Sequence, residues 1–514
     1  MGVPRTGGLK GRAGSVSQIR ITGARIAPLG DSSDVLEGMD IWISGGRIAA
    51  IAPTDAAPSL SGSYETHAFL NGLVLPGLVN SHSHSASALL RGTAPGAPLD
   101  LYVMEAMSRR SRRTMQHVRV GVLIHAIEML KHGITGVVDH FRGGPVPTVE
   151  AVSAVFQAYE DIGMRAVVAP MFEDKRYIDS LPIDQSRLPS DIQDRWNGMK
   201  APLADDYFAM MEEVAAAWGG RDRVRLMLGV DGPQRCTPRL LELAGDFSAR
   251  HGVGLHTHLL EAKTQALMAP PEFEGSFVAY LDHFGLIGPK SSLAHFVWCT
   301  DRDIELAAEK QVNVVNNPVS NLLLGSGLQP TWRMLEAGVS IGLGSDGCSG
   351  NAISVLEQAK FSMLLSRISQ PDCDRWITAK QAMRMATAGG GAVLGEPETL
   401  GAIRVGARAD LAIYDLSDRM HCPLGDIWNH LVMYETGQAV DTVLVGGEVA
   451  LKGGRCTRID ENDIYDQANE FAARDHAENA PYLAATRGER PAFQSLITEI
   501  LQQDTSINRF ARLT

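Results

Sequence analysis

Hydrophobic and polar residues alternate along two β-rich pieces that lie near opposite ends of the chain. Four stretches carry this alternation: residues 18–28, 39–53, 401–416 and 440–456. Alternation broken by glycine turns predicts antiparallel strands. We expect the two pieces, 18–75 plus 397–460, to form one small composite β-sandwich domain that receives a large insertion.

The insertion shows a different hydrophobic pattern, in which short apolar runs alternate with helix-like stretches. We count eight apolar runs: residues 72–82, 133–140, 165–172, 224–232, 252–261, 291–297, 312–318 and 339–347. Amphipathic stretches between them, such as 118–133 and 238–252, end in glycine, the residue expected just past a helix. Apolar strands that are each followed by a helix predict a parallel sheet. Eight such units predict an α/β protein with a TIM-like (β/α)8 barrel over residues 76–396.

Three segments fall outside this scheme. Residues 173–222 require extra helices or a long active-site loop between the third and fourth strands. Residues 461–514 predict C-terminal helices, in two helical stretches, that pack outside the barrel or on a partner. Residues 1–17 are basic and rich in glycine, and we expect a flexible N-terminus.

Charge and composition narrow the range of partners. The formal net charge of the 514 residues is -12, whereas a nucleic-acid partner requires a basic face. No apolar run is long enough to span a bilayer, and the N-terminus lacks the apolar core of a signal peptide. The six cysteines are scattered and form no Cys-x-x-Cys pair, which excludes zinc-ribbon and thioredoxin-type sites. We expect a reduced, cytoplasmic setting. We therefore expect a small-molecule substrate, with no nucleic acid and no membrane.

Metal-ligand residues stand where several predicted strands end. His82 and His84 end the first strand, and alternate residues of a strand point to the same side, so both imidazoles can reach one metal ion. A solvated strand end is the alternative for this pair taken alone. The fifth strand ends in His256, His258 and Glu261. By spacing, either histidine could be the ligand.

Two further strands end in the same residue types. The sixth strand ends in His295 and the eighth in Asp346. Barrel enzymes carry their chemistry at the carboxyl ends of the strands. Three or more histidines with a carboxylate bind a divalent metal and leave a position open for water. The agreement among four strands favours a metal site.

The chain resembles the amidohydrolase superfamily, and within it the branch of cytosine-deaminase-like and triazine hydrolases. The motifs that carry the resemblance are PGLVNSHSH, HTHLLE, AHFVW, NNPVSNLLLGSG, GLGSDG and ATAGGGAVLGEPETLGAIRVGARADLAIYD. They span nearly the whole chain. The match identifies a superfamily rather than a substrate, because residues 296–298 and 316–318 differ from the deaminase pattern.

The resemblance implies a ligand set and two catalytic side chains. The metal ligands would be His82, His84, His258 and Asp346, the last of which would also accept a proton from water. Glu261 matches a proton-shuttling glutamate, and His295 matches a histidine that stabilises developing charge. Binuclear relatives carry a bridging lysine at the end of strand four, and this chain has none there. One divalent metal per chain is therefore expected, zinc with iron as the alternative.

The implied reaction is hydrolysis of a carbon–nitrogen bond other than a peptide bond. A metal-activated water attacks a trigonal carbon, and Glu261 passes a proton to the nitrogen. Deamination of an amino-substituted N-heterocycle is the first expectation. Hydrolysis of an amide, urea or carbamate is the main alternative, followed by triazine dechlorination and by a non-catalytic scaffold.

Five residues are candidates for substrate contact, each with a structural alternative. They are Gln234, Asn321, Asn351, His140 and Trp298. His140 could instead orient its neighbours, Asn321 could staple its loop, and a lone tryptophan is usually a core residue. The loops 93–116 and 173–222 are expected to set specificity. By resemblance, the protein is a homo-oligomer, a dimer or larger.

Overall fold

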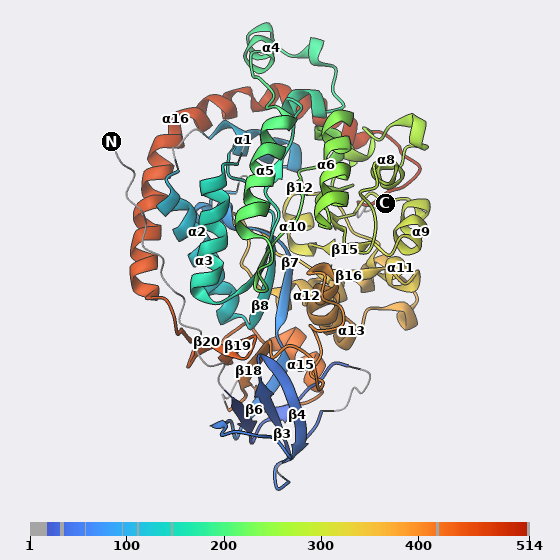
Figure 1. Cartoon of the computed structure of the whole chain (residues 1–514). Coiled ribbons are helices and arrows are strands. Elements are labelled where there is room, and N and C mark those ends of the chain that lie inside the picture. The colour runs from blue at the N-terminus through green and yellow to red at the C-terminus, as the bar shows by residue number, and fades with distance from the viewer. Residues whose placement is uncertain are drawn as a thin grey trace, which may run out of the picture.

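The computed structural model describes residues 18–510, apart from 31–34, 57, 95, 110–112, 145–146 and 418–420. The stretch 1–17, predicted to be flexible, lies outside the described residues. A parallel core, two smaller sheets and a long C-terminal helix make up the described part (Figure 1).

Parallel strands follow one another around the core in chain order. Their bounds are β7 (Leu78–His84), β8 (Ile134–Asp139), β9 (Arg165–Val168), β10 (Met171–Phe172), β11 (Val224–Leu226), β12 (Gly229–Val230), β13 (His256–Leu259), β14 (Ser292–His295), β15 (Asn313–Asn316), β16 (Ser340–Leu343) and β17 (Asp346–Gly347). The order β17-β7-β8-β9-β11 is joined by the pair β10-β12 and by the order β13-β14-β15-β16. A parallel bridge between Leu228 and Leu255 links the β12 and β13 segments. The pairings return to β7 through β17, and all eight predicted runs contain parallel strands.

Helices cover this core on the outside. Their bounds are α1 (Leu99–Ser108), α2 (Met115–Lys131), α3 (Val149–Ile162), α4 (Ser190–Asn197), α5 (Ala204–Trp218), α6 (Pro238–His251), α7 (Lys263–Ala266), α8 (Phe277–His283), α9 (Asp301–Glu309), α10 (Pro318–Leu323), α11 (Thr331–Glu336), α12 (Val355–Ser369), α13 (Ala379–Arg384), α14 (Gly390–Val393), α15 (Ile427–Tyr434) and α16 (Glu461–Gln502). The segment 173–222 contains α4 and α5, so extra helices fill the gap between the third and fourth strands.

The first apolar run divides between two sheets instead of forming one strand. Residues 72–76 form β6 (Gly72–Pro76), which pairs with β18 (Leu411–Asp415), and β7 begins at Leu78. Gly77 lies between them, and its amide donates to the carbonyl of Asp410 at 2.8 Å. A Cβ at Gly77 would lie 2.1 Å from Oγ1 of Thr135, so only glycine allows this close crossing.

Strands from both chain ends form the two smaller sheets. The remaining bounds are β1 (Ile19–Thr22), β2 (Arg25–Ile26), β3 (Met39–Ser44), β4 (Arg47–Pro53), β5 (Glu65–Ala68), β19 (Val440–Val445), β20 (Glu448–Lys452) and β21 (Arg455–Cys456). One sheet has the order β4-β3-β1-β5 and the other β2-β6-β18-β19-β20-β21. Most pairs are antiparallel as predicted, but β1–β5 and β2–β6 are parallel. Ile21, Ile43, Val74 and Leu411 share one apolar cluster, which joins both sheets.

The C-terminal region forms one helix where the sequence predicts two. Helix α16 runs from Glu461 to Gln502 through Pro481 and Pro491. Each proline lacks an N–H donor, yet packing against α1 and α2 holds the helix together: Phe493 and Ile497 share an apolar cluster with Leu101. Figure 1 shows α16 running along the outside of the core. Within the described residues, no helix is both long and apolar enough to cross a membrane.

Candidate metal and hydrolytic site

A chain of hydrogen bonds fixes the ring of His82 at the end of β7. Nδ1 of His82 lies 2.7 Å from Nε2 of His256, and Nδ1 of His256 lies 2.6 Å from Oγ of Ser292. With each Nδ1–H donating along this chain, Nε2 of His82 keeps its lone pair. That nitrogen is buried and has no hydrogen-bond partner in the described part of the chain. His256 therefore lies behind His82 and supports it.

Oxygen acceptors fix the other two imidazoles in the same way. Nδ1 of His84 donates to the carbonyl of His140 at 2.6 Å. Nδ1 of His258 donates to the carbonyl of Asp231 at 2.7 Å and lies 3.0 Å from its Oδ1. A carbonyl or carboxylate oxygen only accepts, so Nε2 of both rings carries the lone pair. This is the arrangement that orients metal-binding histidines.

The three Nε2 atoms converge with the carboxylate of Asp346. Oδ1 of Asp346 lies 3.2 Å from Nε2 of His82 and 3.1 Å from Nε2 of His84. Nε2 of His84 lies 3.2 Å from Nε2 of His258. Ligands bound tetrahedrally to zinc at ~2.05 Å would be spaced by roughly 3.3 Å. The donor set and its spacing fit a divalent metal.

Burial and mutual contacts give His82 and Asp346 the charge states that metal ligands require. Burial and neighbouring imidazoles hold the pKa of His82 well below its usual value. Burial alone would raise the pKa of Asp346, but its contacts with His82 and His84 hold it well below the usual range. Asp346 is thus ionised and His82 neutral, the forms that coordinate a cation.

Glu261 and His295 lie beside this cluster. Oε1 of Glu261 lies 3.7 Å from Nε2 of His295, and that nitrogen lies 3.9 Å from Oδ2 of Asp346. Nδ1 of His295 lies 2.8 Å from Oδ1 of Asn321, which only accepts. Burial raises the pKa of Glu261 to about 8 and lowers the pKa of His295. At neutral pH, Glu261 therefore carries a proton while Nε2 of His295 presents a lone pair.

The backbone at two of these residues is strained. His295 has φ 73° and Asp346 has φ 61°, both in the left-handed region that disfavours a side chain. Such positions cost about 1–3 kcal/mol each and concentrate at functional sites. Gly344 lets β16 pass close to β7, because a Cβ there would lie 2.8 Å from the carbonyl oxygen of His82.

Two of the predicted substrate residues support the segments that carry Glu261 and His295. Asn321 holds His295, as described above. Oε1 of Gln234 accepts from Nε2 of Gln265 at 2.7 Å, and Oε1 of Gln265 accepts from the amide of Glu261 at 2.8 Å. These contacts account for both residues as supports of the turns that carry Glu261 and His295.

The other three residues that were predicted to contact the substrate each have a different environment. Nδ2 of Asn351 donates to the carbonyl of Ser345 at 2.7 Å. Trp298 is buried, and its Nε1 donates to the carbonyl of Ser326 at 2.7 Å, which places the ring in the core. His140 is buried beside His84 and His258, close enough to belong to a group of possible metal ligands.

Three supporting residues of the site were not predicted from the sequence. Asp231 holds His258, Ser292 ends the chain that begins at His82, and Oγ of Ser320 donates to Oδ2 of Asp346 at 2.5 Å. Asp231 ends the fourth strand run, so the strand-end rule that found Asp346 would also have found it. Ser292 and Ser320 carry no comparable pattern.

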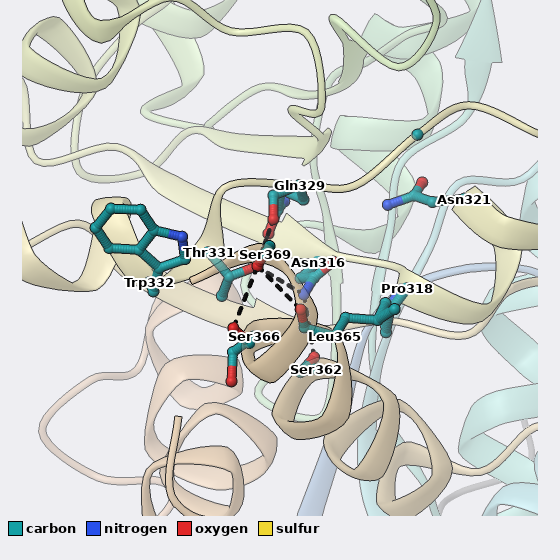
Figure 2. A pocket seen from close by; sticks show the side chains of 11 residues that line it. Asn316, Pro318, Asn321, Gln329, Thr331, Trp332, Ser362, Leu365, Ser366 and Ser369 are labelled. Atoms are coloured by element: carbon teal, nitrogen blue, oxygen red, sulfur yellow. Dashed lines mark hydrogen bonds between the residues drawn. The ribbon is translucent and has the colours of Figure 1, made fainter. Parts of the chain in front are cut away.

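A small cavity lies between the end of β15, α10 and α12, and Asn321, which contacts His295, is one of its lining residues. It holds about 10 Å³, room for roughly one water molecule. Figure 2 shows Asn316 in this cavity, and its Nδ2 donates to Thr331 and Ser362 at 3.0 Å each. The cavity is too small to admit a substrate.

Comparison with known proteins identifies the family. The model of the amidohydrolase family matches residues 73–450. A 5-methylthioadenosine/S-adenosylhomocysteine deaminase of Desulforudis audaxviator is 33% identical over 85% of this chain and 94% of its own length. A 5′-deoxyadenosine deaminase of Methanosarcina mazei is 30% identical over 86% of this chain and 94% of its own.

Solved structures share the fold. An adenosine deaminase from Xanthomonas campestris with bound zinc has a TM-score of 0.79 at 24% identity, covering 90% of this chain and 99% of that one. An atrazine chlorohydrolase from Arthrobacter aurescens TC1 complexed with zinc has a TM-score of 0.78 at 24% identity, covering 88% and 100%. With the family match and the converging metal-ligand set, these findings show that the chain belongs to the amidohydrolase family.

Proposed function

We propose that this amidohydrolase removes the 6-amino group of an adenine nucleoside whose 5′-hydroxyl is absent or replaced. Metal-dependent hydrolytic deamination of a heterocycle agrees with its family and relatives. The substrates named for those relatives, 5′-methylthioadenosine, S-adenosylhomocysteine and 5′-deoxyadenosine, share adenine and a modified 5′ position. The products would be ammonia and the corresponding inosine derivative.

We assign the metal to His82, His84, His258 and Asp346, with one ion per chain. Three imidazoles and one carboxylate suit zinc, with iron as the alternative. A divalent cation held there would supply Lewis acidity, which makes water a nucleophile at neutral pH. The observation that carries this assignment is the hydrogen bonding of all three Nδ1 atoms, which turns the Nε2 atoms toward Asp346.

Glu261 and His295 divide the proton transfers. The protonated carboxyl of Glu261 donates to the ring nitrogen beside the amino-bearing carbon, which makes that carbon a better electrophile. Nε2 of His295 and the carboxylate of Asp346 present acceptors for the proton of the attacking water. Once protonated, His295 stabilises the charge of the tetrahedral carbon centre. The amino group takes up the proton that left the attacking water and departs as ammonia when the carbon–nitrogen bond breaks. The new hydroxyl group then returns its proton to the carboxylate of Glu261 as the carbonyl forms.

The same proposal includes a closed barrel, a β-sandwich domain and a homo-oligomeric assembly. The parallel pairings support a closed (β/α)8 barrel over 76–396, and the shared apolar cluster of the smaller sheets supports a β-sandwich domain from 18–75 plus 397–460. We also propose that the protein is a homo-oligomer, which light scattering of the purified protein would test.

A substrate panel tests the proposed reaction. Ammonia release would be measured with 5′-deoxyadenosine, 5′-methylthioadenosine, S-adenosylhomocysteine and adenosine, beside cytosine, guanine, a urea, an anilide and a chlorotriazine. We expect the highest kcat/KM for a 5′-modified adenosine and loss of activity in His258→Ala. Amine release from the urea or anilide, without ammonia release from any nucleoside, would assign amide hydrolysis instead.

A further inference from the structure

A fourth imidazole, that of His140, lies beside the three that are proposed as metal ligands and has no assigned part in the site. His140 follows β8 and is completely buried. One of its ring nitrogens lies within 4.8 Å of ligand nitrogens of His82, His84 and His258. Its ring centroid lies 4.8 Å from that of His258 and 5.6 Å from that of His84.

The ring nitrogens of His140 differ from those of its neighbours in one respect. The Nδ1 atoms of His82, His84 and His258 are hydrogen-bonded, whereas both ring nitrogens of His140 are buried and have no hydrogen-bond partner among the residues that the structure describes. An unsatisfied buried polar group costs about 1–3 kcal/mol. The cost falls if a ligand satisfies one of these nitrogens, and ligand nitrogens of His82, His84 and His258 lie within 4.8 Å.

We infer that His82, His84, His140 and His258 form a second, all-imidazole position for a divalent cation beside the one that contains Asp346. The inference rests on the three histidines proposed above as ligands. A tetrahedral cation would space four nitrogens by roughly 3.3 Å, so the nitrogens must close by at most ~1.5 Å. Imidazole ligands suit zinc, cobalt, nickel and copper ions.

The two positions are alternatives for one ion. His84 and His258 each commit Nδ1 to an oxygen acceptor, so each offers a single lone pair, at Nε2. One lone pair binds one cation. The ion can therefore shift from Asp346 toward His140, but two ions cannot occupy both positions together.

Cobalt binding in the full chain tests this position without an activity assay. Metal-free wild type, Asp346→Ala and Asp346→Ala/His140→Phe would be titrated with Co²⁺ while its visible absorption is recorded. We expect Asp346→Ala to bind one Co²⁺ with the intense absorption of tetrahedral coordination. His140→Phe in that background should weaken binding by about tenfold or more. His430→Phe, which replaces another buried histidine far along the chain, should leave it unchanged.

The outcomes separate this inference from the proposed function. Equal Co²⁺ affinity in Asp346→Ala with and without His140→Phe would overturn it, as would the absence of Co²⁺ binding in Asp346→Ala. Absence of Co²⁺ binding in the wild type would instead contradict the proposed metal site as a whole. Thermal unfolding checks the fold of each variant, and His140→Gln provides the same comparison if phenylalanine prevents folding.

Discussion

Asp231 orients the ring of His258 and also forms ion pairs with two arginines. Its Oδ2 lies 2.6 Å from Nη1 of Arg235 and 3.2 Å from Nη2 of Arg142. Burial alone would raise the pKa of Asp231, but Arg235 and His258 hold it well below its usual range, so Asp231 is ionised. A charged acceptor strengthens the hydrogen bond that fixes the ring of His258.

We predict that Asp231→Asn lowers zinc affinity by about 10–100-fold, because loss of such a partner loosens the ligand it orients. Competition with a chromophoric chelator measures the affinity. Glu173→Gln is the matched control, since Glu173 pairs with the same Arg142 at 2.8 Å and has no hydrogen bond to His258. Equal losses in both variants would show that the ion-pair network, not the contact with His258, determines the affinity.

Glu261 should make the metal-free enzyme less stable as the pH rises. Its pKa is raised by burial from 4.5 to about 8. Between these values the folded state keeps a proton that the unfolded state has lost, so the free energy of unfolding falls as pH increases. Glu261→Gln removes this dependence. The free energy of unfolding of Glu261→Gln should equal that of wild type below about pH 4.5 and exceed it by a constant amount above about pH 8. That amount is about 1.4 kcal/mol for each unit of pKa shift.

Urea unfolding of chelator-treated wild type and Glu261→Gln between pH 4 and pH 9 measures this difference. Glu242→Gln changes an exposed glutamate and should follow the wild type. A stability difference that stays constant across the range would contradict a raised pKa. Ammonia release by the metal-loaded Glu261→Gln enzyme should fall by roughly 10²–10⁴-fold.

Sequence reasoning located the proposed ligands better than their supports. Strand ends in the sequence identify His82, His84 and Asp346, because parallel strands deliver their carboxyl ends to one side of the sheet. The choice of His258 over His256 came from the family resemblance. The contact between His256 and Ser292 depends on the register of β13 against β14, which pairs these two residues directly. The register between two separate strands cannot be predicted from the local sequence. The hydrogen-bond partners of the ligands, such as Ser292, were therefore not predicted.

At the level of single elements, a glycine run lets one helix approach the core closely. Residues 385–389 form a π-helical turn, and α14 follows at Gly390. A Cβ at Gly389 would lie 1.9 Å from the carbonyl oxygen of Ile341 in β16, the strand that leads to Asp346. A backbone carbonyl cannot rotate away as a side chain can, so β16 or the helix must move.

Gly389→Ala should therefore lower the free energy of unfolding by about 1–3 kcal/mol, the usual cost of overpacking a core. Thermal unfolding of the purified variant measures the loss. Gly288→Ala serves as the control, because a Cβ there meets nothing within 4 Å. A Gly389→Ala protein as stable as wild type would contradict the tight approach of this helix to β16.

The boundaries of elements were the least predictable feature at this scale. The apolar run 72–82 looks continuous, yet β6 and β7 divide at Gly77, since β6 pairs with β18 from the far end of the chain. The parallel pairs β1–β5 and β2–β6 likewise follow from how the two smaller sheets assemble. Alternation predicts a strand but not its partner.

At the scale of the whole molecule, the C-terminal tail holds the loops that carry Glu261 and His295. Arg509 donates to the carbonyls of Val297 at 2.9 Å and Cys299 at 2.6 Å, and its own carbonyl accepts from the amide of Leu328. Nζ of Lys263 donates to the carbonyl of Leu501 in the last turn of α16 and to that of Gln503, the first residue of the tail (503–510). The tail thus connects the segments that follow β13, β14 and β15.

We predict that Arg509→Ala lowers kcat by about tenfold or more with bound metal unchanged, because catalysis depends steeply on the placement of Glu261 and His295. Steady-state kinetics and metal analysis of the same samples separate the two effects. Arg302→Ala on the exposed face of α9 is the control. Loss of metal in parallel with kcat would show that the tail supports the whole fold instead of these loops.

The central claim is that one divalent cation lies between three imidazoles and Asp346. Bound metal per chain, measured by elemental analysis of protein never exposed to chelator, tests it most directly. We predict about one zinc or iron ion per chain in the wild type and its loss in His258→Ala. Two ions per chain, or none, would contradict the account.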